Sequence, residues 1–279
     1  MEPGLQRRIQ RYGWDAAAPD YEALWRVQLS SAQAKLLACA RLEPGQRVLD
    51  VACGTGLTAL AAAAEIGPRG EVIGVDLSGE MVALARRRAA RREASNVRFL
   101  RMDAEKLDLP GECFDAALCA LGLMYVPRPE QALREMRRTL RPGGRLALAV
   151  WGERSRCGWS HVFPIVAAEV TSEVCPLFFD LGTEKHLARL CAAAGFSQIE
   201  QHRIAATLSY ASADEACDAA LVGGPVALAW SRFDEAARLR VRRRYADAIS
   251  PWRYDDGYRV PGEFVVVGAV AAAGITPEE

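Results

Sequence analysis

The fold is decided by the stretch Val48-Leu49-Asp50-Val51-Ala52-Cys53-Gly54-Thr55-Gly56-Leu57-Thr58-Ala59-Leu60. There an apolar run leads without a spacer into a turn that contains two glycines, and the turn leads into a helical pattern. Because Gly54 and Gly56 have no Cβ, the backbone can take positive φ and a ligand can lie directly on the peptide units. The amides that begin the following helix face such a ligand. The stretch therefore predicts a nucleotide site between a strand and a helix.

Around this stretch, short β-rich runs alternate with helical runs from residue 46 to residue 151. Such alternation is typical of βαβ units on a parallel sheet, so we expect a Rossmann-like α/β fold. The expected strands cover residues 46–51, 71–76, 97–102, 114–119 and 144–151. The expected helices cover residues 56–66, 79–93 and 129–140. Ser78 is the expected N-cap of the second helix, and Pro142-Gly143-Gly144 is expected to end the third and lead into a strand.

Helical and apolar runs also flank this region. Further helices are expected at residues 4–12, 20–40, 158–172, 184–194 and over most of 213–249. Two further strands are expected at 197–208 and 263–271. The segment 210–260 is then a helical insertion between two final strands.

Composition narrows the function classes. The 279 residues carry 35 basic and 35 acidic side chains, so no global field favours nucleic acid or an anionic membrane. Arginine runs at 86–88, 91–92 and 238–244 have acidic residues nearby, which indicates solvated helix faces rather than an RNA groove. We therefore expect a single domain that binds no nucleic acid.

The cysteines and the N-terminal residues indicate the cellular compartment of the protein. Eight cysteines occur without a CxxC pair and mostly in apolar runs, which favours buried thiols in a reducing cytosol over disulfides or a metal site. Residues 1–14 lack the apolar core of a signal peptide, and the run 57–66 is too short to span a membrane. We expect a cytoplasmic protein with no membrane span and no metal.

Two enzyme classes build a turn like Gly54-x-Gly56-x-x-Ala59, and one of them binds dinucleotides with an acidic residue about 20 residues on, where Asp76 stands. The flanking residues favour the other class. Asp50-x-Ala52-x-Gly54-x-Gly56 resembles motif I of the class I S-adenosylmethionine (SAM) methyltransferases, in which an acidic residue closes the strand before the loop. Ala52 replaces the usual first glycine of that motif, as in many small-molecule enzymes of the ubiquinone/menaquinone C-methyltransferase type.

A second stretch carries the same resemblance. Val126-Pro127, the helix over 134–140 and Leu140-Arg141-Pro142-Gly143-Gly144 are similar to the motifs that follow the fourth strand in that type. The resemblance is specific over about residues 46–151. It implies a doubly wound, mainly parallel seven-stranded sheet with an antiparallel last strand and a helical lid. The implied division is an N-terminal helical cap at 1–45, a core at 46–209 and 261–279, and a lid insertion at 210–260.

The resemblance implies SAM as cofactor and S-adenosylhomocysteine as product. Asp76 ends the second strand, where its carboxylate can accept both ribose hydroxyls. Asp103 and Ala104 match the family's adenine-binding positions, the carbonyls of residues 119–121 match those that bind the methionine ammonium, and Tyr21 matches a lid tyrosine at the cofactor carboxylate. The expected cofactor-binding residues are Tyr21, Asp50, Ala52, Cys53, Gly54, Thr55, Gly56, Asp76, Leu77, Met81, Asp103, Ala104, Glu105, Cys119, Ala120 and Leu121.

Methyl transfer from a sulfonium is an SN2 displacement with a neutral leaving group, so positioning is expected to do most of the work. A general base adds about 100- to 10,000-fold when the nucleophile is a hydroxyl. His161 follows the fifth strand, where this fold receives substrate, and is the candidate base. Tyr125, Trp151 and Trp159 are the candidate substrate contacts, and such a lining suits an apolar or aromatic small molecule.

Several alternatives stay open from the sequence. An NAD(P)-dependent oxidoreductase would need a catalytic Tyr-Lys pair or a histidine, and lysine occurs only at 35, 106 and 185. A noncatalytic SAM-binding protein would carry the same cofactor residues. The methylated atom can be oxygen, nitrogen or carbon, and a homodimer is also compatible with the sequence.

Overall fold

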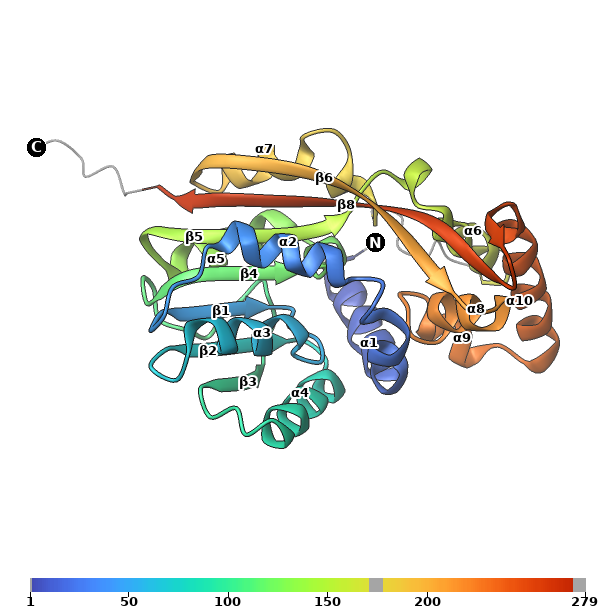
Figure 1. Ribbon diagram of the computed structural model, residues 1–279, viewed down its shortest axis with the longest axis horizontal. Coiled ribbons are helices and arrows are strands. Elements are labelled where there is room, and N and C mark those ends of the chain that lie inside the picture. The colour runs from blue at the N-terminus through green and yellow to red at the C-terminus, as the bar shows by residue number, and fades with distance from the viewer. Residues whose placement is uncertain (1, 171–177, 273–279) are drawn as a thin grey trace, which may run out of the picture.

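A single mixed sheet organises the computed structural model, which describes residues 2–170 and 178–272. The strand order is β3-β2-β1-β4-β5-β8-β6, and β7 pairs with β8 (Figure 1). The strands are β1 Arg47–Val51, β2 Glu71–Asp76, β3 Val97–Arg101, β4 Phe114–Ala120, β5 Leu140–Trp151, β6 Phe196–Tyr210, β7 Arg253–Tyr254 and β8 Gly257–Ala271. Strands β1 to β5 pair in parallel, whereas β8 runs antiparallel to both β5 and β6. The expected Rossmann-like sheet is confirmed, with the two-residue β7 as an eighth strand.

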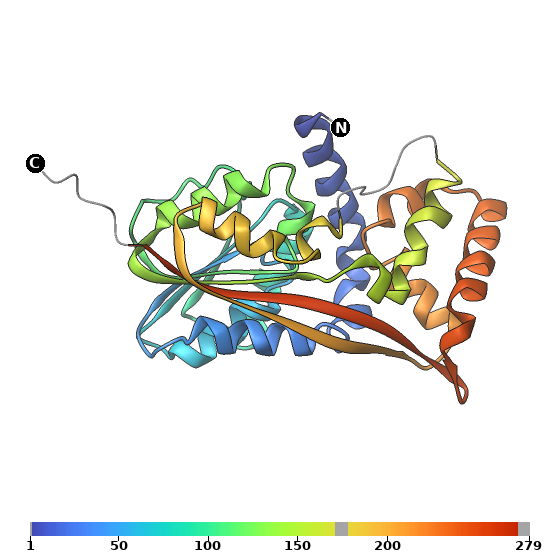
Figure 2. The ribbon, with the colours of Figure 1, turned by 90° about the horizontal axis from the view of Figure 1, so that it is seen from above.

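Helices cover both faces of the sheet. They are α1 Pro3–Trp25, α2 Ser30–Ala40, α3 Leu57–Ile66, α4 Gly79–Arg91, α5 Pro129–Thr139, α6 Val162–Ala167, α7 His186–Ala193, α8 Ala213–Leu221, α9 Ala227–Arg232 and α10 Glu235–Ile249. Figure 2 shows α2 on one face and α5 with α7 on the other. The central strands are apolar and buried on both faces, as expected for a parallel sheet between helices. Within the described residues, we find no helix with the length and apolar character to cross a bilayer.

Helix α1 is longer than expected. The prediction of separate helices at 4–12 and 20–40 is wrong, because one helix runs over Pro3–Trp25 and a second over Ser30–Ala40. The three alanines at 16–18 favour helix, Ala17 and Ala18 are buried, and Pro19 is accommodated inside the helix. Packing of this face outweighs the local breaking tendency of proline.

Several expected boundaries also shift. Strand β5 begins at Leu140, and residues 141–144 form an irregularity in its pairing with β4 rather than a turn before the strand. The helix expected at 158–172 is a 3₁₀ turn at Gly158–His161 followed by α6, and positions 171 and 172 lie outside the described residues. Ser78 caps α4 as expected, since its Oγ accepts the amide N–H of Met81.

The last two long strands form a hairpin that extends past the parallel strands. Strands β6 and β8 each contain 15 residues. Strand β8 begins at Gly257, six residues before the expected position 263. Helices α8, α9 and α10 gather at the far end of this hairpin, and α1 lies between them and the parallel strands (Figures 1 and 2). This arrangement places α1 over the carboxyl edge of the sheet.

Candidate active site

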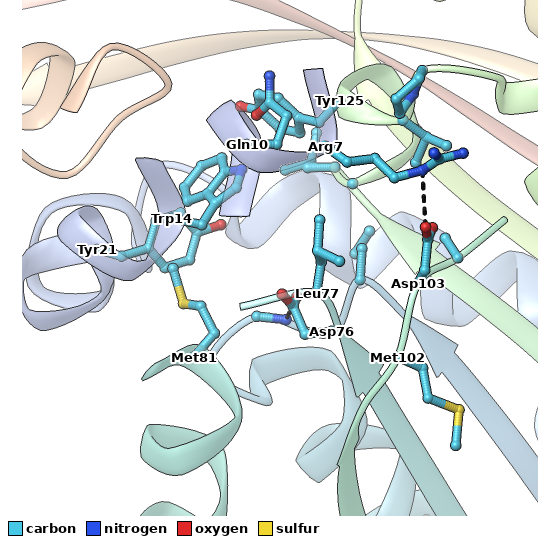
Figure 3. A pocket seen from close by; sticks show the side chains of 18 residues that line it. Arg7, Gln10, Trp14, Tyr21, Asp76, Leu77, Met81, Met102, Asp103 and Tyr125 are labelled. Atoms are coloured by element: carbon cyan, nitrogen blue, oxygen red, sulfur yellow. Dashed lines mark hydrogen bonds and ion pairs between the residues drawn. The ribbon is translucent and has the colours of Figure 1, made fainter. Parts of the chain in front are cut away.

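A cavity of about 740 Å³, partly open to solvent, lies where α1 crosses the carboxyl ends of the parallel strands (Figure 3). Ligands bind at this edge in open α/β sheets. Its lining comprises Arg7, Gln10, Trp14, Tyr21, Ala52, Gly54, Asp76, Leu77, Met81, Met102, Asp103, Ala104, Ala120, Leu121, Gly122, Tyr125, Val126 and Pro127. A smaller cavity of about 290 Å³ adjoins it and is lined by Tyr21, Gln33, Asp50, Ala52, Cys53, Gly54, Thr55, Leu57, Thr58 and Ala120. We call these the main cavity and the loop cavity.

Most of the expected cofactor residues lie around these two cavities. Gly56, Glu105 and Cys119 are not among the described residues that line either one. Burial raises the pKa of the Cys119 thiol to about 12, so this side chain is a packed thiol. The part of the chain that the structure describes shows seven free cysteines and no cluster of metal-ligating side chains.

The two glycines of the loop have different tasks. Gly54 has φ +53°, and a Cβ there would meet no atom within 4 Å, so its missing side chain leaves the cavity open. Gly56 has φ +81°, and a Cβ there would stand 2.7 Å from Cζ of Phe99. The absence of a side chain at Gly56 therefore serves close packing behind the loop rather than the ligand.

Ala52 takes a left-handed conformation that motif I usually gives to glycine. Its φ is +55°, which costs a residue with a Cβ about 1–2 kcal/mol. Its methyl group lies 2.3 Å from the position that a Cβ on Gly122 would occupy. Gly122 lies just after β4, the strand next to β1, so a glycine in this neighbouring turn makes the space for the alanine side chain. This pairing links two sequence positions that motif matching treats separately.

Asp76 is fixed at the end of β2. Its Oδ2 accepts the amide N–H of Gly54 at 2.8 Å, and its Oδ1 accepts that of Ser78 at 2.9 Å. Burial raises the pKa of this carboxyl, and the two backbone hydrogen bonds oppose that shift. Each oxygen keeps a lone pair for a hydroxyl group of a ligand in the main cavity.

Asp50 is a fully buried carboxyl at the end of β1 beside the loop cavity. Neither of its oxygens has a hydrogen-bond partner of good geometry among the described residues. Burial, with a smaller effect of nearby Asp76, raises the pKa of Asp50 to about 8. The carboxyl is therefore mainly protonated at neutral pH until a cation reaches it.

Helix α1 closes the main cavity through an ion-pair cluster. Arg7 Nε lies 2.9 Å from Asp103 Oδ2, the contact drawn in Figure 3, and Arg7 also pairs with Glu105. Glu105 is buried, and its carboxylate also pairs with Arg128 Nη2 at 2.8 Å and accepts the Arg128 amide. Glu105 thus holds α1 and the segment before α5, which differs from the cofactor-binding role expected for it.

Three residues of α1 that were not predicted from the sequence also line the main cavity: Arg7, Gln10 and Trp14. Together with Tyr21 they stand at spacings of three, four and seven residues, which places them on one face of a helix. That spacing could have identified them once a single helix was assumed. Gln33, from α2, was also missed and lines the loop cavity.

A third space, which we call the aromatic chamber, shares part of its wall with the main cavity. Its lining is Trp14, Tyr21, Trp25, Leu29, Leu121, Tyr125, Trp151, Trp159, Gly224 and Pro225. The three residues expected to contact the substrate, Tyr125, Trp151 and Trp159, are among them. None of these ten residues carries a charged side chain, so the chamber suits a neutral, apolar ring.

His161 is not brought to this chamber. It is exposed, its ring lies 5.9 Å from that of Trp252, and it borders a separate open hollow with Cys157 and Thr183. The 3₁₀ turn at Gly158–His161 buries Trp159 and leaves His161 outside. Base catalysis by His161 stays a prediction that this position does not favour.

Comparison with known proteins shows what the chain resembles. Residues 48–144 match a methyltransferase domain model. Demethylmenaquinone methyltransferase of Listeria monocytogenes serotype 4a is 39% identical over 123 residues, which cover 44% of this chain and 52% of that protein. Ubiquinone/menaquinone biosynthesis C-methyltransferase UbiE of Azotobacter vinelandii is 34% identical over 175 residues, 57% of this chain and 69% of that protein.

The match spans about half the length of the Listeria relatives. Among solved structures, phosphoethanolamine N-methyltransferase 2 of Haemonchus contortus in complex with S-adenosyl-L-methionine has a TM-score of 0.60 at 18% identity. That alignment covers 93% of this chain and 57% of the other. The likeness supports the fold of the sheet and its helices.

Proposed function

Because this chain belongs to the class I SAM-dependent methyltransferase family, in its ubiquinone/menaquinone C-methyltransferase-like branch, we propose that it methylates a small apolar or aromatic molecule. The observation that carries this proposal is the aromatic chamber, which adjoins the main cavity and has no charged side chain in its described lining. The relatives named as quinone methyltransferases act, by name, on ring compounds of this kind.

The residues around the cavities fit the cofactor. Asp76 would accept the ribose hydroxyls, and Asp103 with the Ala104 amide would bind adenine between Leu77 and Met81. Asp50 supplies the buried, unpartnered oxygens that a methionine ammonium requires. The polar groups of the loop cavity, among them the residues at 33, 55 and 58, would take the carboxylate.

Bound SAM supplies an electrophilic methyl group whose sulfur leaves without charge. The chain's own contribution is to hold the acceptor in line, exclude water and keep charged groups away from the chamber. Burial raises the pKa of the Tyr21 phenol, so it stays neutral at the junction of the cavities. With no carboxylate or imidazole in the chamber's described lining, we propose positioning rather than base catalysis.

Calorimetry and a transfer assay test this proposal. The protein should bind SAM and S-adenosylhomocysteine but not NADH, and it should transfer labelled methyl groups to members of a panel of naphthoquinols and phenols. Binding without transfer to any acceptor would favour the noncatalytic SAM-binding alternative. Binding of NADH alone would refute the assignment and favour an oxidoreductase.

We further propose that the helical cap, together with α8, α9 and α10, forms a lid over the chamber. Arg7 holds α1 closed on Asp103 and Glu105, and Gly224 with Pro225 brings the segment before α9 to the chamber wall. Hydrogen exchange in α1 should slow when S-adenosylhomocysteine binds, because opening elements are the less stable ones. Arg7→Ala should speed exchange in α1, whereas Arg8→Ala, at an exposed position of the same helix, should not. Unchanged exchange at saturating ligand would contradict a mobile lid.

A further inference from the structure

The indole N–H of Trp159 is buried, and no described residue pairs with it. The side chain is 1% exposed, and Nε1 has no hydrogen-bond partner among the described residues. Buried donors are almost always paired in native proteins, by protein groups, water or ligand, because an unpaired donor retains its full desolvation cost. This donor therefore points to a partner outside the described residues.

The neighbours of Trp159 explain why the described residues supply no partner for its indole N–H. Its ring packs against aromatic rings whose side chains offer no acceptor oxygen. Their centroids lie at 4.8–5.8 Å and belong to Trp25, Trp151, Phe163, Phe178 and Phe179. The Tyr245 hydroxyl donates to the Trp159 backbone carbonyl at 3.5 Å and so does not pair with the indole N–H. The open space that Trp159 lines is the aromatic chamber.

We propose that Trp159 determines specificity by donating its Nε1–H to an acceptor oxygen on the ring compound that occupies the chamber. This inference rests on the proposed function and adds to it the chemical class of the substrate, an aromatic molecule with a neutral carbonyl, ether or hydroxyl oxygen. A carboxylate or phosphate would be buried there without a counter-charge in the described lining, which is far more costly than burying a neutral oxygen.

A pair of probes of matched shape tests the proposal. α-Tetralone carries one carbonyl oxygen on a fused ring, and 1-methylenetetralin replaces that oxygen with a CH₂ group. Equilibrium dialysis in the presence of S-adenosylhomocysteine would give the dissociation constants of both. Trp159→Phe should weaken the binding of α-tetralone by about 3- to 10-fold, the usual effect of one neutral hydrogen bond, and leave the binding of 1-methylenetetralin nearly unchanged.

Trp25→Phe is the matched control. Trp25 lines the same chamber, but its Nε1 already donates to the Ala219 carbonyl at 3.0 Å. This substitution should therefore change the binding of both probes by the same factor. If Trp159→Phe also weakens both probes equally, or neither probe binds the wild-type protein, the proposal is overturned.

The wild-type protein provides a second test in case Trp159→Phe does not fold. A ketone loses more hydration than a hydrocarbon when it is buried. The affinity of the protein for α-tetralone can therefore equal or exceed its affinity for 1-methylenetetralin only if a donor forms a hydrogen bond with the ketone oxygen. Tenfold tighter binding of the hydrocarbon would contradict the donor role. Failure of SAM and S-adenosylhomocysteine to bind at all would instead refute the proposed function, and calorimetry detects that separately.

Discussion

Asp76→Ala is expected to weaken binding of S-adenosylhomocysteine by about 10- to 150-fold. This range corresponds to about 1.5–3 kcal/mol, the usual effect of hydrogen bonds to a charged group. The carboxylate lines the main cavity, and its two oxygens are oriented by the amides of Gly54 and Ser78. Its removal takes away the ribose acceptor and also the anchor of the glycine loop. Calorimetric titration of the variant and the parent measures the change.

Asp115→Ala is the control for a general loss of stability. Asp115, in β4, also accepts a backbone amide, that of Arg47 at 2.7 Å, and it pairs with Arg141. It lies near the beginning of its strand and so at the opposite edge of the sheet from the cavity. This variant should melt at a lower temperature but bind ligand normally. If Asp76→Ala binds like the parent, or if both variants lose affinity alike, the ribose role is wrong.

The core of the fold was predictable because local pattern and burial agree there. The run 48–51 is apolar apart from Asp50 and is followed closely by the glycine turn, and in the structure it is a central parallel strand. The same pattern of apolar runs predicts where each strand ends. The positions of Asp76 and Asp103 at one edge of the sheet could therefore be predicted from the sequence. Parallel strands bring their carboxyl ends together whatever the intervening helices do.

What the sequence could not reveal depends on contacts between distant segments. Glu105 reads as a cofactor residue by its place after β3, but Arg7 and Arg128, far away in sequence, engage its carboxylate. Gly56 belongs to the glycine motif, yet its constraint comes from the ring of Phe99. His161 stands two residues from a chamber residue, and only the 3₁₀ turn decides which of the two faces solvent.

The second large effect concerns pH. Binding of S-adenosylhomocysteine should weaken by about 50-fold between pH 8 and pH 6, because Asp50 must lose a proton when the ligand's ammonium arrives. Burial first, and then the neighbouring charge of Asp76, raises the pKa of Asp50 to about 8 in the free protein. An adjacent cation lowers that pKa again, so binding releases a proton below pH 8. Each further pH unit then costs nearly a factor of 10 in affinity.

Asp50→Asn isolates this titration, because the amide has the shape of the carboxyl and takes up no proton in this range. The variant should bind more weakly at pH 8 but with an affinity that changes little down to pH 6. Calorimetry in buffers of different ionisation enthalpy should detect a released proton for the parent and none for the variant. Persistence of the full pH dependence in Asp50→Asn would assign it to another group, with Asp76 the next to test.

The same carboxyl gives an independent check through folding stability. A folded-state pKa raised above the unfolded value means that the stabilising contribution is complete below about pH 4 and is lost as pH rises through about 8. The unfolding free energy of the parent should therefore fall across this window relative to that of Asp50→Asn. Denaturant titrations of both proteins at pH 5 and pH 8.5 measure the difference. A constant gap between the two proteins would mean that Asp50 is already ionised without ligand, and the proton-release account of cofactor binding would fail with it.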